Sequence, residues 1–204
     1  MLKGIWKLCG FVTLAAVLLM GVGLVSDYRT VTDQLIRLHV VANSDSAEDQ
    51  AVKLQVKDAV VDKLERIMQQ MPDAEQAKVY LQSILPELEE LANRVLEEAG
   101  CQSKATVSLQ QESFGVRQYD TFALPSGVYE SLRIEIGSGE GKNWWCVVFP
   151  TLCIPATSEG FSDAAVGSGF SDTLTSTLTG ESGYELRFFF LDCLGKLENL
   201  IFGR

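Results

Sequence analysis

The sequence predicts an α+β domain, with a mostly antiparallel sheet packed against two long helices and preceded by an N-terminal signal or anchor helix. Three observations predict this class. An apolar run without charge occupies residues 8–25. Apolar residues then recur at helical spacing over residues 47–70 and from Asp73 to about Ala99. Residues 35–42 and 132–136 alternate between apolar and polar side chains, which is the period of a half-buried strand.

The N-terminal run is either a long signal peptide or a membrane anchor. Lys3 and Lys7 precede it without any acidic residue, which places the N-terminus in the cytoplasm and the remainder outside. We expect residues 1–25 to direct export and residues 26–34 to form a short polar linker. Residues 35–204 then form a single exported domain, which meets the membrane only through the N-terminal segment.

The predicted first strand, residues 35–42, places Ile36, Leu38 and Val40 on one side and Arg37 and His39 on the other. Residues 43–46, Asn-Ser-Asp-Ser, follow it and can cap a helix, with Ser46 as the residue that accepts from the free N–H groups. Pro86 lies inside the second helical pattern and predicts a kink or a two-piece helix.

A hairpin is predicted at the centre of the fold. Residues 137–142, Gly-Ser-Gly-Glu-Gly-Lys, favour a turn between the alternating residues 132–136 and the apolar residues 144–149. The second of these runs is predicted to be buried on both faces and ends at Pro150. Further on, residues 156–183 are rich in Ser, Thr and Gly and predict a flexible loop, residues 184–191 predict a strand, and residues 192–202 a short helix.

Charge argues against a nucleic-acid partner. Residues 26–204 carry 15 basic and 27 acidic side chains, a formal charge of −12, whereas nucleic acids and anionic lipids attract basic surfaces. Diffuse negative charge is typical of soluble proteins, and an acidic face that steers towards a basic partner is the alternative.

Four cysteines lie in the exported part: Cys101, Cys146, Cys153 and Cys193. They permit two disulfides in three connectivities. Cys146 and Cys153 flank Pro150, so a chain reversal there would bring them within bridging distance. These two form the candidate disulfide, and small buried thiols in a reducing setting are the alternative.

No catalytic or metal site is predicted. The chain has a single histidine, His39, so a zinc site built on two imidazoles is impossible and any histidine-based nucleophile must use that residue. The cysteines show no Cys-x-x-Cys pairing, and the glycine-rich residues 137–142 open a strand where a phosphate loop needs a helix. We therefore expect no cofactor.

The stretch from Gly139 to Cys153, Gly-x-Gly-x-Asn-Trp-Trp-Cys-Val-x-Phe-Pro-x-Leu-Cys, closely resembles the signature of the stage II sporulation protein R family. Two further blocks agree in the expected order, residues 36–46 with residues 48–50 and 53–54, and residues 127–130 with 132–134. Thr151 stands where a second proline is expected, and the likeness fades after Pro155.

The resemblance implies an exported signalling protein with no enzymatic activity, made in the forespore and released into the space between the two membranes. There, members of the family trigger a membrane-embedded aspartic protease of the mother cell, which cuts the pro-form of sporulation sigma factor E. Packing in the core, strand ends and helix capping also explain these motif residues, and we name seven of them as candidate partner contacts: Arg37, His39, Asn43, Asp45, Asn143, Trp144 and Trp145.

Two other functions remain open from the sequence. One is a secreted cysteine-dependent hydrolase that uses Cys146 or Cys153 with His39. The other is a structural protein associated with the cell wall.

Overall fold

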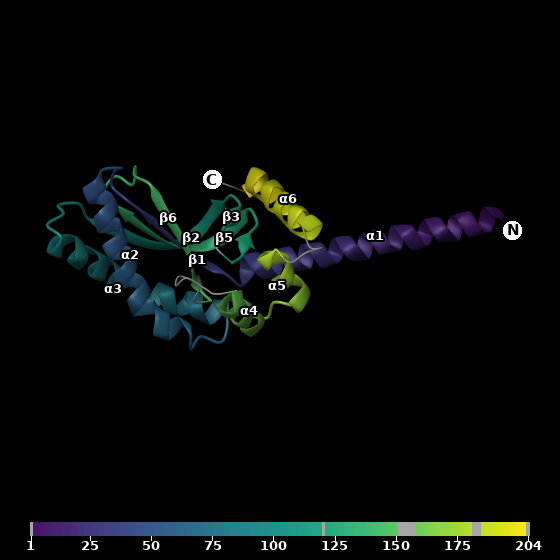
Figure 1. Cartoon of the computed structure of the whole chain (residues 1–204), viewed down its shortest axis with the longest axis horizontal. Coiled ribbons are helices and arrows are strands. Elements are labelled where there is room, and N and C mark those ends of the chain that lie inside the picture. Colours follow the sequence, from purple (N-terminus) through teal and green to yellow (C-terminus); the bar gives the residue numbers. More distant parts are fainter. Residues whose placement is uncertain (1, 120, 151–157, 181–184, 203–204) are drawn as a thin grey trace.

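A computed structural model describes residues 2–119, 121–150, 158–180 and 185–202. It has the predicted α+β class, with one mixed sheet between two layers of helices and a long N-terminal helix that projects from them (Figure 1). The helices are α1 (Leu2–Asp33), α2 (Ala47–Met68), α3 (Ala74–Glu98), α4 (Ser158–Gly167), α5 (Asp172–Thr179) and α6 (Glu185–Phe202). The strands are β1 (Ile36–Val41), β2 (Ala105–Phe114), β3 (Arg117–Gln118), β4 (Ala123–Leu124), β5 (Gly127–Ile136) and β6 (Asn143–Phe149).

The main sheet has the order β2-β5-β1-β6. β5 pairs antiparallel with β2 and β6 pairs antiparallel with β1, while β1 and β5 run parallel. The predicted hairpin of β5 and β6 is therefore wrong, because β1 lies between the two strands. The glycine-rich turn must span one intervening strand, a distance that local sequence patterns do not reveal.

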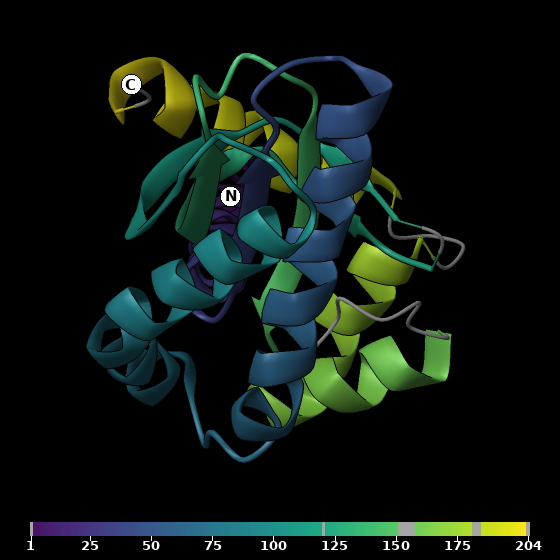
Figure 2. The same ribbon diagram turned by 90° about the vertical axis from the view of Figure 1, so that its left-hand side faces the viewer.

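One face of the sheet packs against α2 and α3, which lie side by side in front of it (Figure 2). Ile36, Leu38 and Val40 point into this core. The predicted cap is confirmed, since Ser46 Oγ accepts from Asp49 N–H at 3.1 Å. Helix α3 is continuous through Pro86, so a two-piece helix is wrong.

The opposite face packs against the end of α1 and against α4, α5 and α6 (Figures 1 and 2). The core on this side, the second core, brings together segments that are far apart in the sequence. Its buried apolar side chains are Tyr28, Val31, Leu35, Phe114, Phe122, Leu124, Tyr129, Val147, Phe161, Ala165, Phe170, Leu174, Leu178 and Leu191. Covered on both sides, β1 is buried at every position rather than half-buried as its alternation predicts.

Three predictions fail in this second layer. Residues 26–33 continue α1, and Tyr28 and Val31 are buried, so they are not a polar linker. Most of the predicted loop at 156–183 is helical, as α4 and α5, and Ser171 caps α5 by accepting from Leu174 N–H at 3.2 Å. The predicted strand at 184–191 begins α6, because a short aromatic run suits either structure and tertiary packing decides.

Candidate functional site

The two strongest sequence blocks meet in space. The loop at residues 137–142 lies against residues 43–46, which connect β1 to α2. Asn43 Oδ1 accepts from Ser138 N–H at 3.1 Å, and Asp45 Oδ1 accepts from Lys142 N–H at 2.7 Å. The predicted contacts Asn43 and Asp45 therefore hold the glycine-rich loop in place.

A buried lysine supports the same junction from α2. Lys53 Nζ donates to the carbonyl of Lys142 at 2.8 Å and to Gln50 Oε1 at 2.7 Å. Burial lowers the pKa of Lys53, although the nearby Asp45 carboxylate opposes this shift. The loop is thus fixed by side chains from α2 and from the segment that connects β1 to α2.

His39 lies in an ion-pair cluster on the sheet face opposite α2 and α3. Its Nδ1 lies 3.1 Å from Glu112 Oε2 on β2, and Arg133 Nη1 on β5 donates to Glu112 Oε1 at 2.7 Å. Arg133 also pairs with Glu135 at 2.6 Å. Burial acts to raise the pKa of Glu112, but the hydrogen bonds with His39 and Arg133 outweigh it and lower that pKa to about 2.

The tryptophans point to opposite faces, as alternation along β6 predicts. Trp145 stacks on the His39 ring, with centroids 3.7 Å apart, and His39 Nε2 lies 2.9 Å from the side-chain oxygen of Asn143. Trp144 lies on the α2 side, where Lys57 Nζ is 5.0 Å from its ring centre, and it keeps 37% of its surface exposed. Trp145 is a packing residue and Trp144 an accessible one.

Arg37 is fully buried on the sheet face that carries His39, opposite α2 and α3. Its guanidinium lies 3.9 Å from the ring centre of Phe114 and 5.1 Å from that of Tyr129, and Nη2 donates to Tyr119 Oη at 3.1 Å. Arg37 cannot touch a partner directly, and the same holds for His39, which is 5% exposed. Both act through the residues they position.

Sequence reasoning missed Glu112, Arg133 and Phe114, which complete these contacts. The parity of β2 and β5 would have placed all three on one sheet face, since even positions of β2 and odd positions of β5 share it. The pairing of His39 with Glu112 depends on the strand order, which the sequence does not reveal.

The thiol–histidine arrangement of a hydrolase is not formed by Cys146. Cys146 lies in the core beside α2 and α3 and is disulfide-bonded, whereas His39 points to the other face of the sheet. Cys153, its predicted partner, lies outside the described residues, so this pairing stays a prediction. Cys101 and Cys193 are free. Within the described ranges, no group of His, Cys, Asp and Glu could hold a metal ion.

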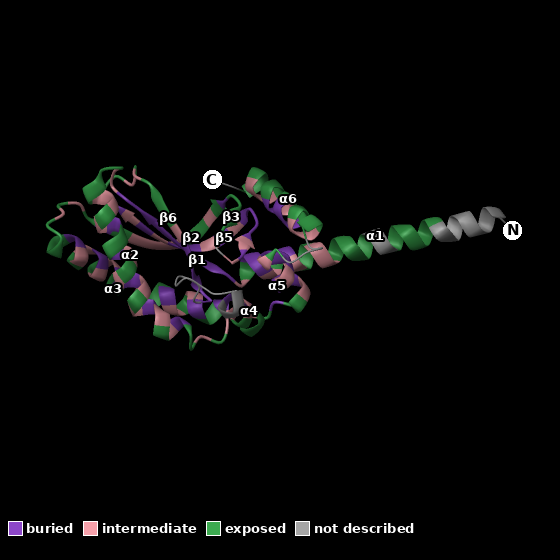
Figure 3. Ribbon diagram, viewed as in Figure 1, coloured by how far each residue is buried: buried purple, intermediate pink, exposed green. Residues whose placement is uncertain are grey.

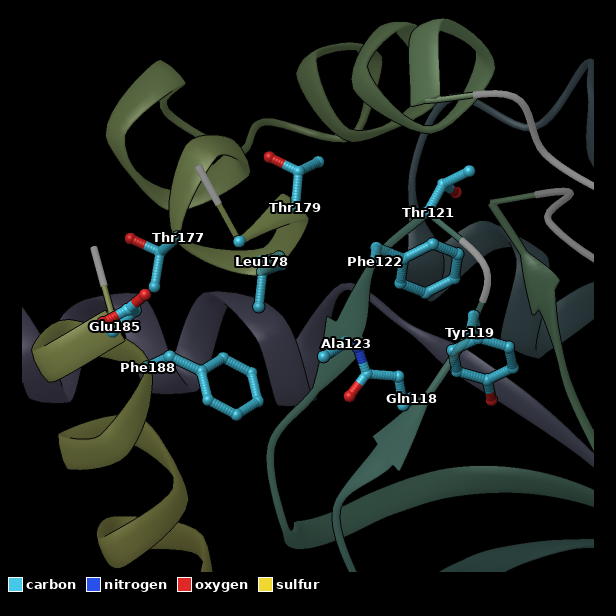
Figure 4. A pocket seen from close by; sticks show the side chains of 11 residues that line it. Gln118, Tyr119, Thr121, Phe122, Ala123, Thr177, Leu178, Thr179, Glu185 and Phe188 are labelled. Atoms are coloured by element: carbon cyan, nitrogen blue, oxygen red, sulfur yellow. The ribbon is translucent and has the colours of Figure 1, made fainter. Parts of the chain in front are cut away.

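A pocket of about 280 Å³ lies elsewhere, between β3–β4 and helices α5 and α6 (Figure 4). Phe122 and Phe188 line it with Thr177 and Thr179, and Glu185 contributes a carboxylate. None of its described lining residues carries a thiol or an imidazole, and none of them is a predicted site residue.

A model of the stage II sporulation protein R family matches residues 32–159. The chain is also 37% identical over 130 residues to stage II sporulation protein R of Bacillus subtilis, covering 64% of this chain and 58% of that relative. The matched part thus spans less than two thirds of the relative's length. No solved structure matches the chain.

The family match covers β1 to β6, including the docked loops and the ion-pair cluster, and it begins at the end of α1. A helix long and apolar enough to cross a membrane, Gly10–Asp33, precedes it and suits a signal anchor or export segment. This chain belongs to the stage II sporulation protein R family and has a role in sporulation.

Proposed function

We propose that this protein is a signal passed between the two compartments of a sporulating cell. In this proposal it is made in the forespore and exported into the intermembrane space. There it activates a membrane-embedded aspartic protease of the mother cell, which processes pro-sigma factor E. The observation that carries the proposal is the family match over the whole sheet and its loops.

The position of the docked loops supports it. Helix α1 leaves the domain at one end, whereas the loops at residues 43–46 and 137–142 lie at the other end (Figure 1). A chain tethered through α1 would therefore extend these loops away from its own membrane. That is the direction in which a partner in a facing membrane would be found.

Among the seven candidate contacts, the exposed ones gather at these loops. Asp45 and Asn143 are exposed, and Trp144 presents over a third of its surface beside Lys57. A partly exposed tryptophan with a neighbouring cation is typical of an interface anchor. We assign Trp144 the direct contact, and we assign Arg37, His39, Asn43 and Trp145 the task of holding β6 and its loop in place.

Activation in this proposal is allosteric, without turnover of a substrate by the protein itself. Both nitrogens of the His39 ring already face Glu112 and Asn143, and Trp145 covers the ring, so little room is left for a reacting group. Binding can shift the protease towards its active state only if this domain binds that state more tightly than the inactive one.

Co-expression of the chain, the candidate protease and pro-sigma factor E in a host that does not sporulate tests the proposal. We expect processing on an immunoblot only when all three are present. Trp144→Ala should reduce processing, and Val79→Ala, which removes a more exposed apolar side chain from α3, should not. Processing in the absence of the chain would contradict its role as the activator of the protease. Unchanged processing with Trp144→Ala would contradict the assignment of Trp144 as the direct contact.

A further inference from the structure

Helix α6 has apolar side chains on two opposite sides. Its inner side is fixed to the domain, because a Cβ on Gly195 would collide with the carbonyl of Ser126, and Asp192 Oδ1 accepts from Ser126 N–H at 3.1 Å. Its outer side carries a stripe at helical spacing, and each member is at least half exposed: Leu186, Phe189, Phe190, Leu197, Leu200 and Ile201. We call this stripe the outer face of α6 (Figure 3).

The outer face lies where α1 enters the domain. Arg187 forms an ion pair with Asp27, and Tyr28 Oη donates to Glu198 Oε2 at 2.5 Å. These contacts join residues far apart on α6 to neighbours on α1, so α6 crosses α1 at a steep angle (Figure 1). A helix that crosses α1 steeply lies near the plane of a membrane that α1 spans.

The level of this crossing matches the end of the apolar segment. Residues 8–25 carry no charge, and residues 10–15 and 18–22 of this run are exposed on the projecting part of α1. Asp27 is the first charged residue after this run. Because a bilayer core takes about 20 helical residues, Asp27 and the start of α6 lie at its outer boundary.

We propose that the outer face of α6 rests on the lipid surface at the outer side of the membrane that α1 spans. Leucine and phenylalanine on one side and a packed domain on the other are typical of a helix that lies in the interface. The stripe carries no acidic side chain, so the attraction is apolar, and zwitterionic lipids suffice despite the acidic domain. Together, α1 and α6 fix the orientation of the domain, with the docked loops pointing away from the membrane.

Cys193 provides the probe, because it is free and exposed on α6. The full chain with Cys9→Ser and Cys101→Ser is labelled with nitrobenzoxadiazole, checked by peptide mass spectrometry, and placed in phosphatidylcholine vesicles at less than one chain per vesicle. Lipids with a nitroxide near the headgroup should lower the emission about twofold or more. The same label at Cys101, with Cys9→Ser and Cys193→Ser, should keep its emission.

A paired variant, Leu197→Asp with Leu200→Asp, should remove the quenching while circular dichroism and insertion of α1 stay unchanged. Val79→Asp on α3 is the matched control and should leave the quenching intact. A Cys193 label that remains open to aqueous iodide would overturn the proposal. So would shielding that needs a high protein-to-lipid ratio, which would indicate a second copy on this face. No protease is present, so the result is independent of the activation proposal.

Discussion

The side-chain oxygen of Asn43 occupies the space that a Cβ atom on Gly137 would need. Gly137 also has a φ of +62°, a conformation that side chains of L-residues rarely adopt. The two residues lie far apart in the sequence, and Asn43 holds the glycine-rich loop onto the end of β1 because its side-chain oxygen also accepts from Ser138 N–H.

Gly137→Ala should therefore lower the free energy of unfolding, by about 2 kcal/mol, because it combines backbone strain with a collision. Urea denaturation measures this loss. Gly115→Ala is the control, since a Cβ there meets nothing within 4 Å, and its effect should be close to zero. Equal stability of the two variants would contradict a tightly docked loop.

The Glu112 carboxylate should stabilise the fold in a pH-dependent manner. Its pKa is about 2 in the folded state, well below the ordinary value of 4.5. A lowered folded pKa gives stability that is complete above pH 4.5 and is lost as the pH falls towards 2. Glu112→Gln should thus cost about 2 kcal/mol at pH 6 and much less at pH 2.5.

Denaturation curves at the two pH values provide the measurement for Glu112→Gln. Glu98→Gln, at an exposed position, serves as the control. Its free energy of unfolding should differ from that of the original chain by a similar amount at both pH values. A stability difference between the Glu112→Gln variant and the original chain that stays constant with pH would mean that the contacts of the Glu112 carboxylate with His39 and Arg133 contribute nothing.

Replacing the two neighbouring tryptophans should lower the stability of the protein by different amounts. Trp145→Ala removes the ring that stacks on His39 and packs at 5.0 Å from Phe114, so we expect a loss of about 3 kcal/mol. Trp144→Ala removes a partly exposed ring and should cost about 1 kcal/mol. Thermal unfolding of both variants tests the order, and the reverse order would place the wrong ring in the core.

Much of the fold could be predicted from local patterns. The periods of α2 and α3 and the cap at Ser46 are local properties, and the structure has them nearly where the sequence places them. The pairing of β1 between β5 and β6 is not local, because it joins residues about 100 positions apart. The site could not be predicted for the same reason. Glu112 looks like an ordinary exposed acid of an alternating strand, and only the strand order places Arg133 of β5 and His39 of β1 beside it.

The C-terminal layer shows the limit of composition. Residues 158–180 are rich in Ser, Thr and Gly, yet Phe161, Phe170 and Leu174 bury their side chains against the sheet. A few apolar residues are enough to fix these helices on the sheet, because each of them packs into the second core. The period of such short helices is too brief to detect against their polar background.

Arg37 should respond to substitution in an unusual order. Its cation is fully buried against two aromatic rings, and Nε and Nη1 have no hydrogen-bond partner within the described part of the chain. Arg37→Met fills a similar volume without a buried charge, whereas Arg37→Lys keeps the charge and loses the planar group that stacks on Phe114. We expect the Lys variant to be less stable than the Met variant by about 1 kcal/mol or more in urea denaturation. A more stable Lys variant would indicate that the charge itself is needed there.

The end of α1 should behave as part of the domain rather than as a linker. Tyr28 and Val31 are buried with Leu35 in the second core, while Val25 is 41% exposed. A chain that begins at Ser26 should keep a cooperative thermal transition, because it loses only the projecting part of α1. A chain that begins at Gln34 should unfold at a temperature lower by about 5 °C or more, since it loses two buried side chains from a core that no other segment can fill. Val31→Ala in the full chain should reproduce part of this loss and Val25→Ala none of it. If both truncated chains unfold at the same temperature, the continuity of α1 into the core contributes nothing, and the helix would serve only for export.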